Sequence, residues 1–260
     1  MKQLAESRPV LFSMLVTITF VLLVAMIAIT GKLAGDVHQL EAIGALGRLC
    51  LALLGLAGLL YLGWRDDLGI WPVPSIRTWI PVFPALLYVL LVYPPLFTGG
   101  YAFNITDRPL AVLVALNGFA AGVMEEIFFR GLVLGSFLKS WGLSPRVIVR
   151  SLVVSALLFS VPHALNVLAG VDPLRVSAQL IWAFLLGVVF AGLLVIVRSI
   201  WPIALLHGFA NAVVHVNRIG HEVTPTTTSA LLMALAPLPL LLYVWILLKR
   251  RLPKSARSAA

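Results

Sequence analysis

The stretch Glu125-Glu126-Ile127-Phe128-Phe129-Arg130 decides how this sequence is interpreted. It lies inside an apolar run from about residue 109 to residue 138, which is long enough to cross a bilayer. Each charged residue in hydrocarbon costs ~2.5–3.5 kcal/mol even on the gentler insertion scales. No other acidic residue of the sequence falls inside an apolar span. Two carboxylates and a guanidinium in such a place indicate a functional site.

The composition around this stretch is that of a membrane protein. Of 260 residues, 61% are hydrophobic and 11% are charged, whereas a soluble domain carries roughly 25% charged residues. The net charge of +9 does not indicate a nucleic-acid partner, because the basic residues flank apolar spans and reflect topology. The single cysteine, Cys50, excludes an internal disulfide and a cysteine-based metal cluster.

Apolar runs of about 20 residues predict an all-α, polytopic membrane helix bundle with about eight transmembrane helices. The expected spans are 9–30, 44–64, 78–97, 109–138, 146–168, 175–197, 202–217 and 229–248. We divide the chain into three N-terminal transmembrane helices (1–108), a core that carries the polar motifs (109–217), and a last helix with a basic tail (218–260).

The basic residues test this topology. With eight spans both termini lie on one side, which then carries thirteen of the 19 Lys and Arg residues, and the other side carries five. This bias follows the positive-inside rule and predicts an integral protein of the cell membrane with both termini in the cytoplasm. The thirteen are Lys2, Arg8, Arg65, Arg77, Lys139, Arg146, Arg150, Arg198, Lys249, Arg250, Arg251, Lys254 and Arg257; the five are Lys32, Arg48, Arg108, Arg175 and Arg218.

The two glutamates cannot face one site equally, because adjacent helical residues point ~100° apart. Glu126 and Arg130 are spaced i,i+4 with the glutamate first, which favours an intrahelical ion pair. Glu125 is then left without a partner on its own helix. It must stay protonated, meet a cation from another helix, or bind a metal.

His163, in the fifth span, is the first candidate to meet it. Pro162 removes a backbone donor, so we expect a kink that opens space beside the histidine. A lone histidine in an apolar helix is more often a packing residue than a catalytic one. Polar residues on three separate spans change that balance.

His207 and Asn211, in the short and polar seventh span, are spaced i,i+4 and share a face. The small Gly208 beside them would let another helix approach closely, and Gly118 and Gly122 before the glutamates would do the same on the fourth span. By residue count His207 lies nearer the end of its span than Glu125 does. The fourth helix must therefore extend beyond the membrane, or the seventh must tilt or start deeper, for these groups to meet.

Two chemistries fit these groups. Glu125, His163 and His207 could bind Zn²⁺ with an open position for water, and the metal would lower the pKa of that water. Without a metal, Glu125 could act as general base, and His207 with Asn211 could donate to a developing oxyanion. Both routes lead to hydrolysis of an acyl bond by an activated water.

The motifs E-E-x-x-x-R, F-x-x-x-H and H-x-x-x-N, each on its own predicted span, resemble those of the CPBP family, also called the Abi family. That family includes CAAX prenyl endopeptidases and relatives tied to bacteriocin processing or immunity. The resemblance covers about residues 109–217. It implies an intramembrane endopeptidase that acts on a membrane-associated peptide or protein, dependent on glutamate or on a metal.

The resemblance also implies roles for single residues. Glu125 looks like the essential glutamate, with Glu126 and Arg130 as its motif partners. His163 looks like the second catalytic residue, with Phe159 packed beside it. His207 and Asn211 look like the third element, as ligands or oxyanion donors. The alternative is a non-enzymatic membrane protein, either a bacteriocin immunity factor or a small proton-coupled transporter, which would also need a buried Glu–His pair.

Overall fold

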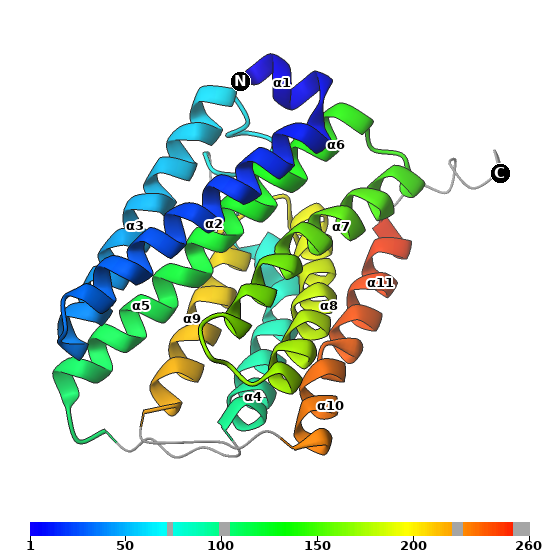
Figure 1. Ribbon diagram of the computed structural model, residues 1–260. Coiled ribbons are helices and arrows are strands. Elements are labelled where there is room, and N and C mark those ends of the chain that lie inside the picture. Colours follow the sequence, from blue (N-terminus) through cyan, green and yellow to red (C-terminus); the bar gives the residue numbers. More distant parts are fainter. Residues whose placement is uncertain (72–74, 99–104, 220–225, 252–260) are drawn as a thin grey trace.

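The computed structural model describes residues 1–71, 75–98, 105–219 and 226–251, without the side chains of 93–98. Every regular element within these residues is helical (Figure 1). In chain order they are α1 (Lys2–Ser7), α2 (Pro9–Leu33), α3 (Val37–Leu62), η1 (Ile76–Val82), α4 (Phe83–Thr98), α5 (Arg108–Glu126), η2 (Ile127–Leu134), α6 (Gly135–Trp141), α7 (Pro145–Ser160), η3 (Val161–Val167), α8 (Pro173–Val197), α9 (Trp201–Asn217), α10 (Thr227–Leu235) and α11 (Leu238–Arg251).

By length and composition, six helical segments of the described chain could cross a membrane. They are Pro9–Leu33, Val37–Leu62, Arg108–Trp141, Pro145–Val167, Pro173–Val197 and Thr227–Arg251. The two other predicted spans, 78–97 and 202–217, fall on the shorter helices η1–α4 and α9. The prediction of a polytopic membrane helix bundle is confirmed, and six of its eight predicted spans are long and apolar enough by themselves.

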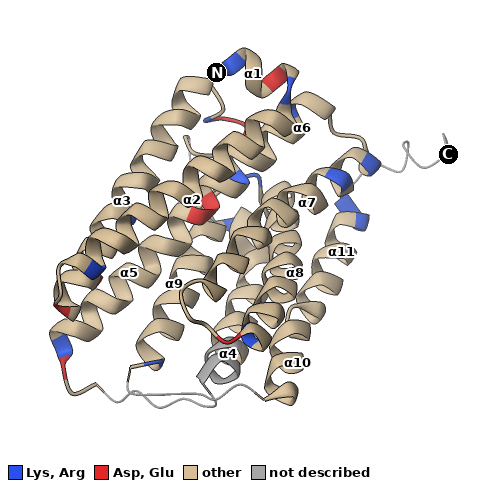
Figure 2. Cartoon of the chain, viewed as in Figure 1, with Lys and Arg blue, Asp and Glu red and all other residues tan. Residues whose placement is uncertain are grey.

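The charged residues lie mostly at the two ends of the helices, and few lie in the middle of the bundle (Figure 2). Several helix ends follow from local sequence. Asp36 and Asp107 accept hydrogen bonds from the backbone N–H groups of Gln39 and Leu110, which caps α3 and α5. α3 ends at Gly63, whose φ of 75° is the left-handed conformation that glycine adopts without strain.

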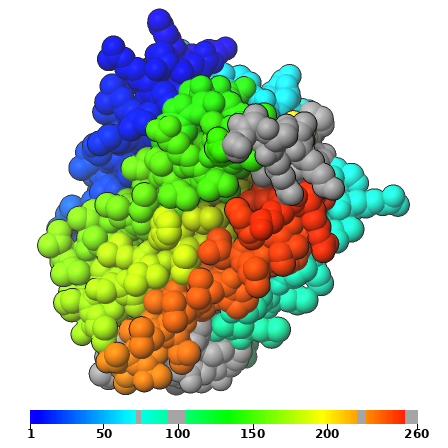
Figure 3. All heavy atoms as spheres, turned by 90° about the vertical axis from the view of Figure 1, so that its right-hand side faces the viewer, coloured from blue at the N-terminus to red at the C-terminus, as the bar shows by residue number. Residues whose placement is uncertain are grey.

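Helices α10 and α11 lie along the outside of the bundle and cover one flank of α8 (Figure 3).

The start of α9, at Trp201, is fixed by hydrogen bonds to the segment that follows α3. The indole N–H of Trp201 donates to the Ile70 carbonyl at 3.2 Å, and the backbone N–H of Ile200 donates to the Leu68 carbonyl at 2.9 Å. These bonds fix where α9 begins.

The contact between α5 and α9 brings the polar motifs together. A Cβ on Gly122 would lie 2.6 Å from the backbone N of Gly208, and one on Gly118 would lie 2.9 Å from the carbonyl O of Asn211. The two backbones therefore touch where side chains would normally keep them apart. The predicted close approach at these glycines is confirmed.

The helix that carries the glutamates is continuous from Arg108 to Trp141 but changes type in the middle. Residues Ile127–Leu134 form a π-helix directly after Glu126. The Phe129 carbonyl within it accepts a hydrogen bond from the Ser155 hydroxyl of α7 at 3.2 Å. π-helical turns are rare in proteins, and those that do occur are often found at functional sites. This π-helix was not predicted from the sequence.

Glu125 on α5 and His207 on α9 also lie at the same depth in the bundle. A Cβ on Gly131 would lie 3.4 Å from the Cδ1 atom of Ile200, so α9 begins level with Gly131. Glu125 lies six residues before Gly131, and His207 lies seven residues after Ile200. At 1.5 Å per residue these offsets are nearly equal. The seventh span thus starts deep in the bundle, while the fourth continues past it to Trp141, as the sequence required.

Candidate active site

Glu126 forms the ion pair expected on its own helix. Its Oε1 atom lies 3.1 Å from Nη1 of Arg130, and the side chains are 0% and 1% exposed. Charges buried this completely are stable only when paired. The i,i+4 prediction for these two residues is confirmed.

His207 connects this pair to the second glutamate. Its Nδ1 atom lies 2.7 Å from Oε1 of Glu126, and its Nε2 atom lies 3.6 Å from Oε2 of Glu125. A carboxylate can only accept, so the ion-paired Glu126 accepts the Nδ1–H of the imidazole. The Nε2 atom is thereby turned to Glu125. We call Glu125, Glu126, Arg130 and His207 the glutamate–histidine site.

The two glutamates differ in their access to water. The Glu126 side chain is 0% exposed, whereas that of Glu125 is 20% exposed. His207, at 3% exposed, closes the site on the α9 side. Of the two carboxylates, Glu125 is the one that a water molecule or a substrate can reach.

Aromatic rings enclose the arginine. The guanidinium carbon of Arg130 lies 4.3 Å from the ring centroid of Phe159 and 5.7 Å from that of Phe190. Its Nη2 atom donates to the carbonyl of Gly187 at 3.3 Å. Cation–π contacts and a carbonyl stabilise the charged guanidinium where water is excluded. Phe159, predicted as a supporting residue, therefore contacts Arg130 as well as His163.

His163 lies next to the glutamate–histidine site without bonding to it. Its ring is 5.2 Å from that of Phe159, which is itself 6.2 Å from the ring of His207. Its Nδ1 atom lies 3.1 Å from the Phe159 carbonyl; a carbonyl accepts, so Nδ1 carries the proton. Neutral His163 then keeps Nε2 as an acceptor. Within the described residues it makes no hydrogen bond or ion pair with Glu125.

The expected break at Pro162 is present. The α-helix α7 ends at Ser160, and Val161–Val167 continue as a 3-10 helix that holds His163. Asn211 lies one turn after His207 on α9, half-buried. Its carbonyl packs on Gly118, and no hydrogen bond of its side chain is present among the described residues.

The three candidate zinc ligands are not gathered into one shell. Among the described residues, no three His, Cys, Asp or Glu side chains form a group that could hold a metal ion. Glu125 faces the Nε2 atom of His207, whose Nδ1 atom is directed to Glu126. This arrangement does not fit a Glu125–His163–His207 metal site, and we derive no step through a metal. The zinc hypothesis stays a prediction.

Helix α3, which carries none of the predicted motifs, also places polar side chains against α5. Asn117 accepts a short hydrogen bond from Arg48 of α3 and donates to Oε2 of Glu41 at 2.7 Å. Arg48 also interacts electrostatically with Glu125. We call Glu41, Arg48 and Asn117 the outer cluster. Arg48 inside the apolar span 44–64 was the signal in the sequence that could have indicated it.

Comparison with known families agrees with this geometry. Residues 107–213 match the model of a family described as type II CAAX prenyl endopeptidase Rce1-like. The match covers both glutamates, His163, His207 and Asn211 and leaves the helices α1 to α4 outside. Comparison with curated proteins and with solved structures gives no match.

The class of protein follows from fold and match together: this is an integral membrane protein in which residues 107–213 match a family of membrane proteases. More specifically, the matched segment is of the CAAX prenyl endopeptidase type, and the predicted resemblance to the CPBP family is confirmed there.

Proposed function

We propose that the protein is an intramembrane endopeptidase in which Glu125 is the general base. The observation that carries this proposal is the position of Glu125, which is the accessible carboxylate and lies 3.6 Å from Nε2 of His207. Glu126 is occupied by Arg130 and by Nδ1 of His207. Glu125 is thus the carboxylate that is left to take a proton.

The reaction is a hydrolysis in two proton transfers. Glu125 takes a proton from a water molecule while the water oxygen attacks the peptide carbonyl. The negative charge that develops on the carbonyl oxygen is stabilised by donors on α9: the Nε2–H of His207 in its doubly protonated form, and the Asn211 amide. Glu125 then returns the proton to the leaving amine, which breaks the C–N bond and releases an acid and an amine.

His163 supplies a further group for the water. Because Nδ1 donates to the Phe159 carbonyl, Nε2 is the acceptor of the neutral ring. We assign that atom to orienting the attacking water towards the carbonyl. The role differs from that of His207, which acts through its contact with both glutamates.

The substrate proposal comes from the matched family, whose description names a CAAX prenyl endopeptidase. We propose a peptide or protein with a prenylated C-terminal CAAX sequence, held at the membrane by its lipid. We further propose that both termini of the enzyme face the cytoplasm of the cell membrane. The concentration of Lys and Arg around α1, the start of α7, and the end of α11 supports that orientation (Figure 2).

The test is cleavage of a prenylated CAAX peptide by the purified full-length protein, followed by mass spectrometry. We expect Glu125→Gln to lower the rate by about 10²–10⁴-fold, the usual contribution of a general base, and to leave thermal unfolding close to that of the wild type. The matched control is Glu6→Gln, on exposed α1. Unchanged cleavage by Glu125→Gln would remove the proposal and favour the immunity-factor or transporter alternatives.

Two further measurements separate the chemistries. Metal analysis of the same preparation, with cleavage measured before and after a chelator, tests the zinc hypothesis directly. Retained activity after removal of all bound metal supports the metal-free route. Loss of activity that returns with added Zn²⁺ would instead require a rearrangement of the site to bring the three predicted ligands together.

A further inference from the structure

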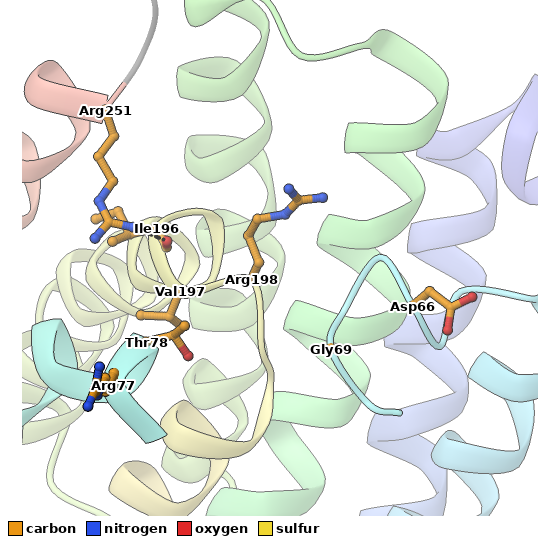
Figure 4. Close-up of a pocket in the computed structure, with 8 residues that line it drawn as sticks. All are labelled: Asp66, Gly69, Arg77, Thr78, Ile196, Val197, Arg198 and Arg251. Carbon is orange, nitrogen blue, oxygen red and sulfur yellow. Dashed lines mark hydrogen bonds between the residues drawn. The ribbon is translucent and has the colours of Figure 1, made fainter. Parts of the chain in front are cut away.

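A second polar feature is a pocket that shares no lining residue with the glutamate–histidine site. This pocket of about 660 Å³ is lined by Asp66, Gly69, Arg77, Thr78, Ile196, Val197, Arg198 and Arg251 (Figure 4). Its three arginines come from η1, from the residue after α8, and from the last turn of α11. Elements distant in the sequence thus bring three guanidinium groups to one hollow.

Within the part of the chain that the structure describes, acidic side chains do not neutralise the positive charge of this pocket. Among the described residues, Arg77, Arg198 and Arg251 form no ion pair with an acidic side chain, and the one lining carboxylate, Asp66, pairs with Arg65 at 3.3 Å. Arg251 donates to the carbonyl of Ile196 at 2.8 Å, which holds it against the end of α8. The pocket therefore offers unmatched positive charge in a partly preformed setting.

The backbone of Arg198 has a conformation that is unfavourable for an arginine. It follows α8 at φ 53°, and it is the one non-glycine residue with positive φ in the described chain. Glycine is the usual residue at such a helix end. Strain of this kind points to a role for the side chain that glycine would not supply.

Exposed apolar side chains lie beside the charge. Ile76 and Ile80, on the same short helix as Arg77, are 69% and 67% exposed. A soluble anion would gain nothing from contact with these apolar side chains. A phospholipid carries a phosphate and acyl chains in one molecule, so it can contact the arginines and the isoleucines together. Basic pockets between membrane helices are known to take anionic lipid headgroups.

We propose that this pocket binds the phosphate headgroup of an anionic phospholipid, with the acyl chains lying along η1. The site is separate from the glutamate–histidine site and does not depend on the proposed hydrolysis. A substrate peptide carboxylate or free phosphate would share the chemistry of the headgroup but not the need for apolar contact.

The test measures binding of phosphatidylglycerol and of phosphatidylcholine to the purified full-length protein by native mass spectrometry. We expect a bound phosphatidylglycerol that phosphatidylcholine does not replace. Arg77→Gln and Arg198→Gly should each weaken it about fivefold, the effect of one arginine near a charged lipid surface. Arg198→Gly should also keep or raise thermal stability, because glycine suits the positive φ.

The control is Arg146→Gln, which removes an exposed charge outside the pocket. Equal losses for Arg146→Gln and Arg77→Gln would mean general surface charge and would overturn the proposal, as would wild-type binding by Arg198→Gly. Displacement of the lipid by inorganic phosphate alone, or by a peptide with a free C-terminal carboxylate but not by its amide, would assign the pocket to those ligands instead.

Discussion

The outer cluster and the glutamate–histidine site both place charges along α5, and they differ in how those charges are matched. In the outer cluster Asn117 bridges one glutamate and one arginine, and all three side chains find partners. In the glutamate–histidine site two glutamates share one arginine and one histidine. The second site therefore carries a carboxylate beyond what its arginine can neutralise.

This difference in charge balance suggests a structural role for the outer cluster and a chemical role for the glutamate–histidine site. A balanced set of polar groups needs no further partner and serves packing or orientation. An additional carboxylate beside an imidazole can take up and release a proton, which is what general base catalysis requires. The contrast can be tested by removing the matched charges and the unmatched one in turn.

The largest effect on stability is expected for Arg130→Met. This change leaves Glu126 buried at 0% exposure without its cation, which should cost ~3–5 kcal/mol. Thermal unfolding of the purified protein, followed by intrinsic fluorescence, measures it. Arg65→Met is the matched control, because it breaks an ion pair whose side chains are 58% and 68% exposed, and such pairs contribute ~0–1 kcal/mol.

A double variant sharpens the same point. In Glu126→Gln/Arg130→Met both charges disappear together, so part of the lost stability should return. If the single and double variants unfold at the same temperature, burial of an unpaired charge is not what destabilises Arg130→Met.

The next effect concerns the helix contact that assembles the site. Gly122→Ala would place a methyl group 2.6 Å from the backbone of α9, so the helices must move apart, at ~1–3 kcal/mol. The shift would also move His207 from the glutamates, so cleavage should fall along with stability. Thermal unfolding and the peptide assay are measured together.

Gly58→Ala, on α3, is the matched control. Its new methyl group would meet one atom of Leu132 at an ordinary 3.8 Å, and alanine favours a helix over glycine by ~1 kcal/mol. This variant should therefore be as stable as the wild type or more so. A Gly122→Ala protein with normal stability and activity would show that α5 and α9 do not need backbone contact.

The parts of this structure that depend on spacing within one helix could be predicted from the sequence. The Glu126–Arg130 pair follows from i,i+4 geometry, and the span pattern follows from apolar length. The approach of α5 to α9 followed from glycines on both helices. In each case the signal, whether a spacing, an apolar length or a glycine, can be read within a single helix.

Features that depend on partners from other helices were missed. In the π-helix Ile127–Leu134, the Phe129 carbonyl accepts a hydrogen bond from the Ser155 hydroxyl of α7. Glu126 was assigned to Arg130 alone, whereas it also binds His207, because one carboxylate oxygen can serve two donors across the α5–α9 contact. The sequence lists such donors but not which of them meet. For the same reason the role of His163 stays a prediction.

The smallest effect is expected in the outer cluster. Arg48→Gln removes the charge but can still donate to Asn117, so the loss of stability should not exceed that of one ordinary hydrogen bond, ~0.5–1.5 kcal/mol. Because Arg48 also interacts with Glu125, cleavage should fall less than about tenfold, which corresponds to 1.4 kcal/mol. A loss as large as that of Glu125→Gln would place Arg48 within the catalytic machinery. The unmatched carboxylate would then be balanced from α3, and the distinction between the two clusters would fail.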